Sequence, residues 1–225
     1  MVYMCYRPYG FKVNLYFIKN IYYNLHMKKI GRPQSIKRID ILDKCVEKYW
    51  EVGIDNISFN NIIKYSCVSK STIYRLFGDE DDLQYYSLKH YYENIIKEWH
   101  TIIEEHKDVN TLIDEYLTGI VEGKHTPCLY NKSIMVKKNL GKRSINLLDT
   151  IDKSYKKSWY IAIKKSSNKN LDDKHLKSLA AFIAAQVALI NTLKQNKVSK
   201  NELLLIISVI KKSVKFFHSK TLPYK

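Results

Sequence analysis

The side chains best suited to chemistry lie in a short polar segment that begins at Ser69. Six of its residues carry a hydroxyl, an ammonium or a guanidinium group: Ser69, Lys70, Ser71, Thr72, Tyr74 and Arg75. On the exposed N-terminal part of a short helix, such groups suit phosphates and base edges in the major groove of DNA. Short polar helices with one apolar side are common, so this segment alone only suggests DNA binding.

The residues around this segment have the spacing of a helix-turn-helix. Ser58 is a good N-cap for a short helix from residue 59 to about residue 65, and Ser69 caps another from residue 70 to Phe77. Gly78 then ends the second helix. The apolar residues expected to pack on each other and on a preceding helix are Phe59, Ile62, Val68, Ile73 and Phe77.

The flanking segments predict the helices that must position this motif. Before it, an apolar stripe at spacings of three and four predicts a helix that ends at Gly53; its members are Ile39, Leu42, Val46 and Tyr49, with Cys45 beside them. After it, Asp79 caps a long helix that extends to about His106, and the acidic residues of its first turn complement the helix dipole.

The run from Ile41 to Leu83 resembles the N-terminal domain of the TetR family of transcription regulators. ILDKCVEKYWEVG resembles the first helix of that family, and ISFNNIIKYSCVSKSTIYRLFGDEDDL resembles the rest of the domain. The resemblance implies an all-α fold, with an N-terminal three-helix DNA-binding domain at residues 31–80. A C-terminal helical ligand-binding and dimerisation domain would occupy residues 81–225. Independently of the resemblance, Met27 opens the segment MKKIGRPQSIKR, which has the character of a natural protein start. We therefore expect residues 1–30 to be an extension, of which residues 1–26 are either mis-assigned upstream sequence or a poorly ordered tail.

The resemblance also implies DNA-contacting roles for residues of the two short helices. Ser58 would cap the first helix and hydrogen-bond a phosphate. Tyr74 would contact the DNA backbone, and Arg75 would read a guanine because its guanidinium engages O6 and N7 together. The residues that would face the major groove are Lys70, Ser71 and Thr72, next to the capping Ser69.

A basic segment ahead of the first helix could add an arm to this interface. Arg32, in the sequence Gly31-Arg32-Pro33, would reach a phosphate or the minor groove together with Lys37 and Arg38. An ordinary solvated tail explains the same residues equally simply.

Four positions depart from the family pattern. Cys67 stands where the family usually has a glycine in the turn, where a left-handed backbone costs a non-glycine residue roughly 1 kcal/mol. Ile63 replaces a small alanine, Leu76 replaces an aromatic residue or histidine, and Glu80 replaces a lysine that contacts phosphate. These changes leave two functions open: a ligand-responsive repressor that binds a palindromic operator as a dimer, or a TetR-like helical interaction protein that has lost specific DNA binding.

Apolar periodicity continues through the second half of the chain. It predicts helices at about 109–122, 128–139, 144–165, 172–195 and 200–218. The helices Leu176–Leu193 and Leu203–Phe217 form a hairpin that could pair with a second copy of the chain as a four-helix bundle. An intramolecular core explains their spacing equally well.

In the TetR family the middle helices, here about Leu83 to Lys165, usually enclose a small-molecule effector. Binding there would change the separation of the two recognition helices, which must be about 34 Å, one DNA turn. Aromatic residues could line such a site but are more often plain core, so no ligand-binding residue is assigned. The basic clusters at 132–143 and 153–165 could favour an anionic effector, although a solvated lysine-rich face is the simpler interpretation.

Net charge does not locate the DNA-binding part. The chain carries a formal charge of +16, which favours a polyanionic partner, either nucleic acid or an anionic membrane surface. Between Gly31 and Leu88, however, eight Lys and Arg accompany nine Asp and Glu. The inference of DNA binding therefore depends on the motif.

The sequence lacks the patterns of an enzyme, a metal site or a membrane protein. It has no Ser/His/Asp arrangement, phosphate-binding glycine loop or metal cluster at usable spacing, so we expect neither catalysis nor a cofactor. The cysteines show no paired spacing and indicate reduced thiols: Cys5, Cys45, Cys67 and Cys128. No span reaches the roughly 18 uninterrupted apolar residues of a membrane helix. We therefore expect a cytoplasmic protein.

Overall fold

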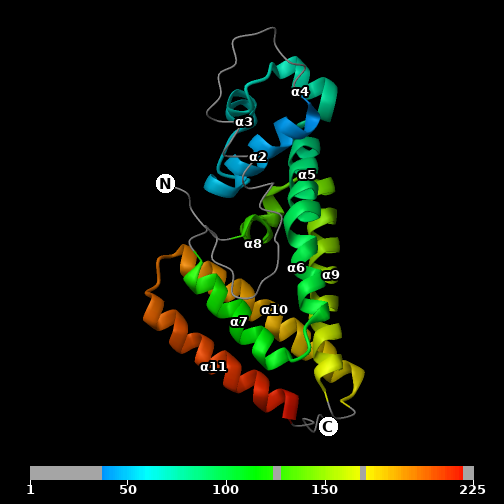
Figure 1. Cartoon of the computed structure of the whole chain (residues 1–225). Coiled ribbons are helices and arrows are strands. Elements are labelled where there is room, and N and C mark those ends of the chain that lie inside the picture. Colours follow the sequence, from blue (N-terminus) through cyan, green and yellow to red (C-terminus); the bar gives the residue numbers. More distant parts are fainter. Residues whose placement is uncertain (1–36, 124–127, 168–170, 220–225) are drawn as a thin grey trace. The chain divides into compact units, whose positions relative to one another are not determined.

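The computed structural model describes residues 37–123, 128–167 and 171–219, and it is helical throughout these ranges (Figure 1). No strand occurs in the described ranges, which confirms the prediction of an all-α fold. The predicted N-terminal arm residue Arg32 and the extension 1–30 lie outside them. The chain forms two compact units, each described below by itself.

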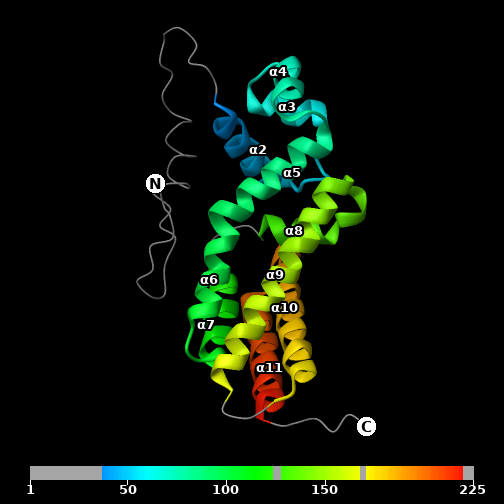
Figure 2. The same ribbon diagram turned by 90° about the vertical axis from the view of Figure 1, so that its right-hand side faces the viewer.

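The first unit holds the predicted helix-turn-helix and comprises, among the described residues, 37–98 and 128–151. Its elements are α2 (Arg38–Val52), α3 (Phe59–Ser66), α4 (Lys70–Phe77), α5 (Glu80–Tyr91), the π-helical turn η1 (Tyr92–Ile96), α8 (Leu129–Met135), the 3₁₀ turn η2 (Lys137–Asn139) and the start of α9 (Lys142–Ser166). We call it the motif unit. Figure 2 shows α3 and α4 next to α2 and α5.

The core of the motif unit joins α2 to the two short helices. Ile41, Cys45 and Val46 of α2 are fully buried and belong to the same apolar cluster as Ile62 of α3 and Ile73 of α4. Burial of apolar surface of this kind is the main stabilising contribution to such a fold. Ile39, which the sequence pattern placed in the buried stripe of α2, is 52% exposed, because the buried face of the helix begins at Ile41.

The second unit comprises, among the described residues, 99–123, 152–167 and 171–219. It contains most of α6 (Lys97–Glu105), then α7 (Val109–Glu122), the second part of α9, α10 (Asp173–Gln195) and α11 (Lys200–Ser219). We call it the bundle unit. Helices α7, α10 and α11 pack side by side (Figure 1), and the fully buried Trp159 of α9 belongs to their common core.

Helix α10 is, among the described helices, long and apolar enough to span a membrane by length and composition. Its inner stripe includes Leu176, Ile183, Val187 and Ile190, which are buried in the core of the bundle unit. The polar Asn191 is also buried, and its Nδ2 donates to the carbonyl of Val187 at 2.9 Å. This burial is typical of a core helix of a globular protein.

The predicted helix from Asp79 to His106 is not a regular α-helix along its whole length. Five residues, Tyr92–Ile96, form a π-helical turn between α5 and α6. A π turn accommodates one extra residue within a helix. Similarly, the predicted helix at 128–139 consists of α8 followed by a single 3₁₀ turn.

Candidate nucleic-acid interface

Local hydrogen bonds set the boundaries of the two short helices. The Ser58 hydroxyl accepts the backbone N–H of Asn61 at 3.4 Å and so caps α3. In the same way, the Ser69 hydroxyl accepts the N–H of Thr72 at 3.2 Å and caps α4. Both caps satisfy donors that a helix start leaves without an intrahelical acceptor.

The turn between α3 and α4 depends on a left-handed residue. Cys67 has φ 60° and ψ 32°, and its N–H donates to the carbonyl of Lys64 at 3.1 Å. This conformation is the one expected where the family has glycine, and a side chain there costs free energy. Its thiol is exposed and lies 3.4 Å from the carbonyl oxygen of Tyr65.

Helix α4 separates apolar from polar side chains along its length. Ile73 and Phe77 are buried against the core, whereas the predicted DNA-contacting residues lie on the outer side. Most of these are exposed and Thr72 is half-buried; the exposed ones are Ser69, Lys70, Ser71, Tyr74 and Arg75. The structure therefore brings this predicted set together on one face.

Three hydroxyl groups meet at the start of α4. The Ser69 Oγ lies 2.9 Å from Ser71 Oγ and 2.8 Å from Thr72 Oγ1. Hydroxyl hydrogens rotate, so each group can donate or accept. A phosphate or a base edge can replace these mutual bonds without leaving a polar group unsatisfied.

The ring of Tyr74 links the two short helices. It is 48% exposed, and its edge-to-face contact with Phe59 of α3 places the ring centroids 5.7 Å apart. The Lys70 Nζ lies 5.8 Å from the centre of the same ring. Such contacts restrict the rotamers of aromatic and cationic side chains, so Lys70 and Tyr74 are partly oriented before any ligand arrives.

The two described residues of the predicted arm lie at the start of α2. Lys37 is exposed, and its backbone N–H donates to Asp40 Oδ2 at 3.1 Å. The guanidinium of Arg38 lies 4.0 Å from the ring centre of Tyr86 and 4.8 Å from that of Phe77. Arg38 therefore already makes cation–π contacts with Phe77 at the end of α4 and with Tyr86 of α5.

The other three positions that depart from the family pattern are found in different surroundings. Ile63 is buried, so the core accommodates its larger side chain. Leu76 is half-buried and packs against the core instead of presenting a polar group. Glu80 is exposed in the first turn of α5, where its charge would repel a nearby phosphate.

A carboxylate that sequence reasoning missed fastens α5 to the start of α9. Asp81 accepts the backbone N–H groups of Arg143 at 2.9 Å and Ser144 at 3.1 Å, and the Ser144 hydroxyl at 2.7 Å. Burial would raise the pKa of this carboxyl, but its hydrogen bonds to Ser144 and Arg143 outweigh burial and lower the pKa. Gly141 leaves the space that the Asp81 side chain occupies.

The side chain of Arg143 extends the same contact. Its guanidinium pairs with Asp82 and lies 4.3 Å from the ring centre of Tyr85. These partners are about 60 residues apart in sequence (Asp81 and Arg143 differ by 62). Only the acidic first turn of α5 was visible in the sequence, where it is explained by the helix dipole alone.

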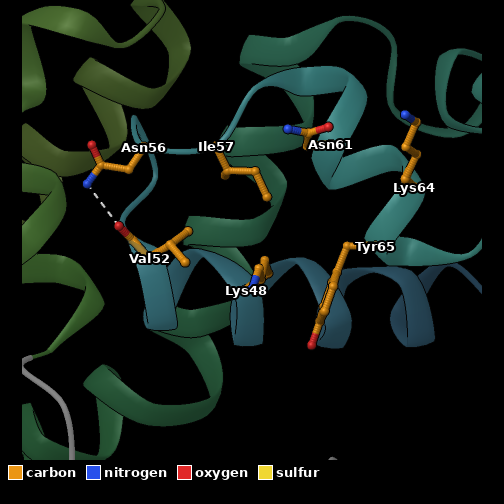
Figure 3. A pocket seen from close by; sticks show the side chains of 7 residues that line it. All are labelled: Lys48, Val52, Asn56, Ile57, Asn61, Lys64 and Tyr65. Carbon is orange, nitrogen blue, oxygen red and sulfur yellow. Dashed lines mark hydrogen bonds between the residues drawn. The ribbon is translucent and has the colours of Figure 1, made fainter.

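An open hollow of about 520 Å³ lies between α2 and α3 (Figure 3). Its lining combines polar, cationic and apolar side chains: Lys48, Val52, Asn56, Ile57, Asn61, Lys64 and Tyr65. The Asn56 Nδ2 donates to the Val52 carbonyl at 2.9 Å, and Lys48 pairs with Glu51 at 2.7 Å. The hollow is thus the outer edge of the α2–α3 contact, separate from the polar face of α4.

The fold resembles solved transcription regulators, although no family model and no curated protein matches the chain. A cysteine mutant of the TetR family transcriptional regulator CifR, complexed with double-strand operator DNA, matches with a TM-score of 0.64 and 16% identity, over 80% of this chain and 98% of that one. NemR from E. coli, in its reduced form, matches with a TM-score of 0.60 and 14% identity, over 78% of this chain and 95% of that one. A TetR-family transcriptional regulator from Streptomyces coelicolor matches with a TM-score of 0.57 and 14% identity, over 79% of this chain and 95% of that one.

These matches extend over nearly the whole length of each regulator. Their low sequence identities make them evidence about the fold. The helix-turn-helix, the long helices that follow it and their order along the chain together give this protein the fold of the TetR-family transcriptional regulators.

Proposed function

We propose that this chain is a DNA-binding transcriptional regulator that reads a palindromic operator as a dimer. One observation carries the proposal: α4 presents a continuous polar face of hydroxyl, ammonium and guanidinium groups while its other face is buried. This arrangement suits a recognition helix in the major groove. The solved regulator CifR, which has this fold, is complexed with operator DNA.

A dimer is proposed because the bundle unit retains exposed apolar surface on its last two helices. Leu205 and Val209 of α11 are 69% and 63% exposed, and Leu189 of α10 is 41% exposed. Ala181 and Ala185 lie exposed on α10 as well, and small residues allow another helix to approach closely. The side chains of the two helices predicted to form the dimer, Leu176–Leu193 and Leu203–Phe217, are described except for those of Phe216 and Phe217.

The regulator is further proposed to be a cytoplasmic repressor that responds to a small molecule and has no catalytic activity. In this scheme an effector shifts the equilibrium between conformations that hold the two recognition helices at different separations. Turnover of a substrate by the purified protein would contradict the scheme.

A second candidate function is an interaction protein that keeps the fold but has lost specific DNA binding. The exposed Glu80 and the half-buried Leu76 favour it, because each replaces a residue type that contacts phosphate in the family. The nearly neutral charge of the segment 31–88 favours it as well.

A binding assay against DNA from upstream of the gene separates the two candidates. Fluorescence anisotropy should show salt-sensitive binding to a palindrome, and Arg75→Ala should weaken it by about 1–3 kcal/mol and relax the preference at one base pair. Lys70→Ala should weaken binding to all sequences equally and reduce the salt slope by about 1.

Lys157→Ala, which removes an exposed cation from α9, is the matched control and should leave operator binding unchanged. Weak binding of equal strength to every duplex, unaffected by Arg75→Ala, would favour the interaction protein.

A further inference from the structure

An array of aromatic rings extends from the surface of the bundle unit into its core. Trp99 of α6 is 37% exposed, and its ring meets Tyr116 of α7 edge to face at 5.4 Å between centroids. Tyr116 meets Trp159 of α9 in the same way at 5.7 Å, and Trp159 meets Tyr155 at 6.2 Å. We call these four residues the aromatic array. It offers apolar ring surfaces continuously from an exposed residue to a fully buried one.

The inner end of the aromatic array contains a hydrogen-bond donor that lacks an acceptor. Trp159 is 0% exposed, and its Nε1 has no hydrogen-bond partner among the described residues. A buried N–H without an acceptor is destabilising, and the face of a neighbouring ring accepts it only weakly. Such a group is retained at a cost in stability and requires an explanation, and an acceptor supplied by a bound molecule is one.

The ionisable groups next to the array determine which charge a ligand there can carry. The His100 ring lies 5.6 Å from that of Tyr155, and burial lowers the pKa of this histidine although Glu104 acts in the opposite direction. The imidazole is therefore neutral at pH 7. The Glu104 carboxylate accepts the Ser158 hydroxyl at 2.7 Å, so a formal negative charge lies on this side of the core.

We propose that the aromatic array binds an uncharged, planar aromatic molecule that carries a carbonyl or similar hydrogen-bond acceptor. The acceptor takes the N–H of Trp159, and the ring of the ligand packs against Tyr116 and Tyr155. Trp99 forms the entrance. An anion is disfavoured because it would be desolvated next to the Glu104 carboxylate. That the bound molecule acts as an effector rests on the proposed function, whereas binding of the molecule to the aromatic array does not.

Two probes of nearly the same shape test the proposal on the full-length protein without DNA. 2-Acetylnaphthalene is a neutral ketone, and 2-naphthoate is its anionic counterpart at pH 7. Calorimetric titration should give saturable binding of the ketone, about tenfold tighter than that of the carboxylate, a difference of about 1.4 kcal/mol. Absence of saturable ketone binding, or a naphthoate that binds equally well or better, would overturn the proposal.

Variants then locate the site. Trp159→Phe keeps a ring and removes the donor, so the ketone should bind about threefold to tenfold more weakly. Trp99→Ala, at an exposed position where folding is least affected, should weaken binding by a similar factor through lost ring contact. Trp50→Phe, in the motif unit, is the control and should bind the ketone like the parent. Unchanged binding by both Trp159→Phe and Trp99→Ala would place the ketone elsewhere and overturn the proposal.

Operator binding measured on the same protein keeps the two proposals separate. If the ketone binds and no duplex does, the aromatic site stands and the proposed regulator fails. If a palindrome is bound specifically and the ketone is not, the regulator stands and this ligand class is wrong.

Discussion

The motif unit and the bundle unit differ in how their polar side chains are hydrogen-bonded. At the start of α4 the hydroxyl of Ser69 bonds to those of Ser71 and Thr72 at the surface, where water or a phosphate can replace either partner. In the bundle unit the indole N–H of Trp159 is buried in the core and has no acceptor among the described residues. The first arrangement leaves polar groups free to exchange partners at the surface, whereas the second leaves a single buried donor that our proposed ligand would satisfy.

Exposed and buried polar groups also differ in how much they affect the free energy of unfolding. Exposed polar groups contribute little to stability, because water satisfies them in the folded and unfolded chain alike. Buried groups change the free energy of unfolding strongly whether they are satisfied or not. The two regions should therefore respond differently to substitution, and five predictions follow from this difference, from the largest effect to the smallest.

Trp159→Ala should lower the free energy of unfolding by about 3–5 kcal/mol, because it leaves a cavity in the core of the bundle unit. Urea denaturation followed by circular dichroism measures the loss. Arg75→Ala, on the exposed face of α4, should change the same quantity by less than about 0.5 kcal/mol. Equal losses in the two variants would remove the contrast between the regions.

Asp81→Ala should cost about 1–3 kcal/mol, because the first turn of α9 loses the acceptor for two backbone N–H groups. Glu105→Ala, which removes an exposed acid from α6, is the control and should have little effect. Chemical denaturation at pH 7 compares the two variants. A neutral outcome for Asp81→Ala would show that α9 is held by its apolar contacts alone.

The parent protein and Asp81→Ala should also differ in how their stability responds to acid. The folded-state pKa of Asp81 is lower than its ordinary value of 3.8, so its contribution to stability is present above that value. The contribution is lost as the pH falls through the lowered pKa. The stability gap between parent and Asp81→Ala should therefore be constant from pH 7 to about pH 5 and shrink below about pH 4.

Ser69→Ala should cost about 1 kcal/mol through loss of the α4 cap, whereas Ser69→Gly should cost only a few tenths. Thermal unfolding of the parent protein and the two variants measures this order of stability. Both variants remove the hydroxyl that meets Ser71 and Thr72, so a shared loss of operator binding with unequal losses of stability would separate recognition from capping.

Cys67→Gly should stabilise the protein by about 0.5–1 kcal/mol, because glycine adopts the left-handed backbone of this turn without steric cost. Cys67→Ala keeps a β-carbon and should give no such gain. A destabilising Cys67→Gly would mean that the thiol contributes more through its contacts than the backbone strain costs.

Features that depend on neighbouring residues in the chain were predictable from the sequence. The caps at Ser58 and Ser69 and the left-handed turn at Cys67 each involve residues within four positions of one another, so residue type and spacing were sufficient. The apolar spacing likewise predicted the helices of both units to within a few residues.

Features that join distant parts of the chain were not predictable. The contact of Asp81 with Ser144 and the cation–π contact of Arg38 with Tyr86 connect segments whose proximity only the folded chain establishes. The unsatisfied N–H of Trp159 is a further case, because the sequence shows an aromatic residue at a core position and not which atoms surround it.

The π-helical turn at Tyr92–Ile96 has a consequence for comparing the sequence of this protein with those of proteins that have the same fold. One extra residue is accommodated there, so the inward-facing positions of α6 are displaced by one relative to those of α5. A regulator with an uninterrupted helix in this place can be aligned to the chain only by opening a one-residue gap inside a helix, where gaps are normally penalised most. Without that gap, the residues of α6 are aligned one position out of register, and the sequence identity of the two proteins is underestimated.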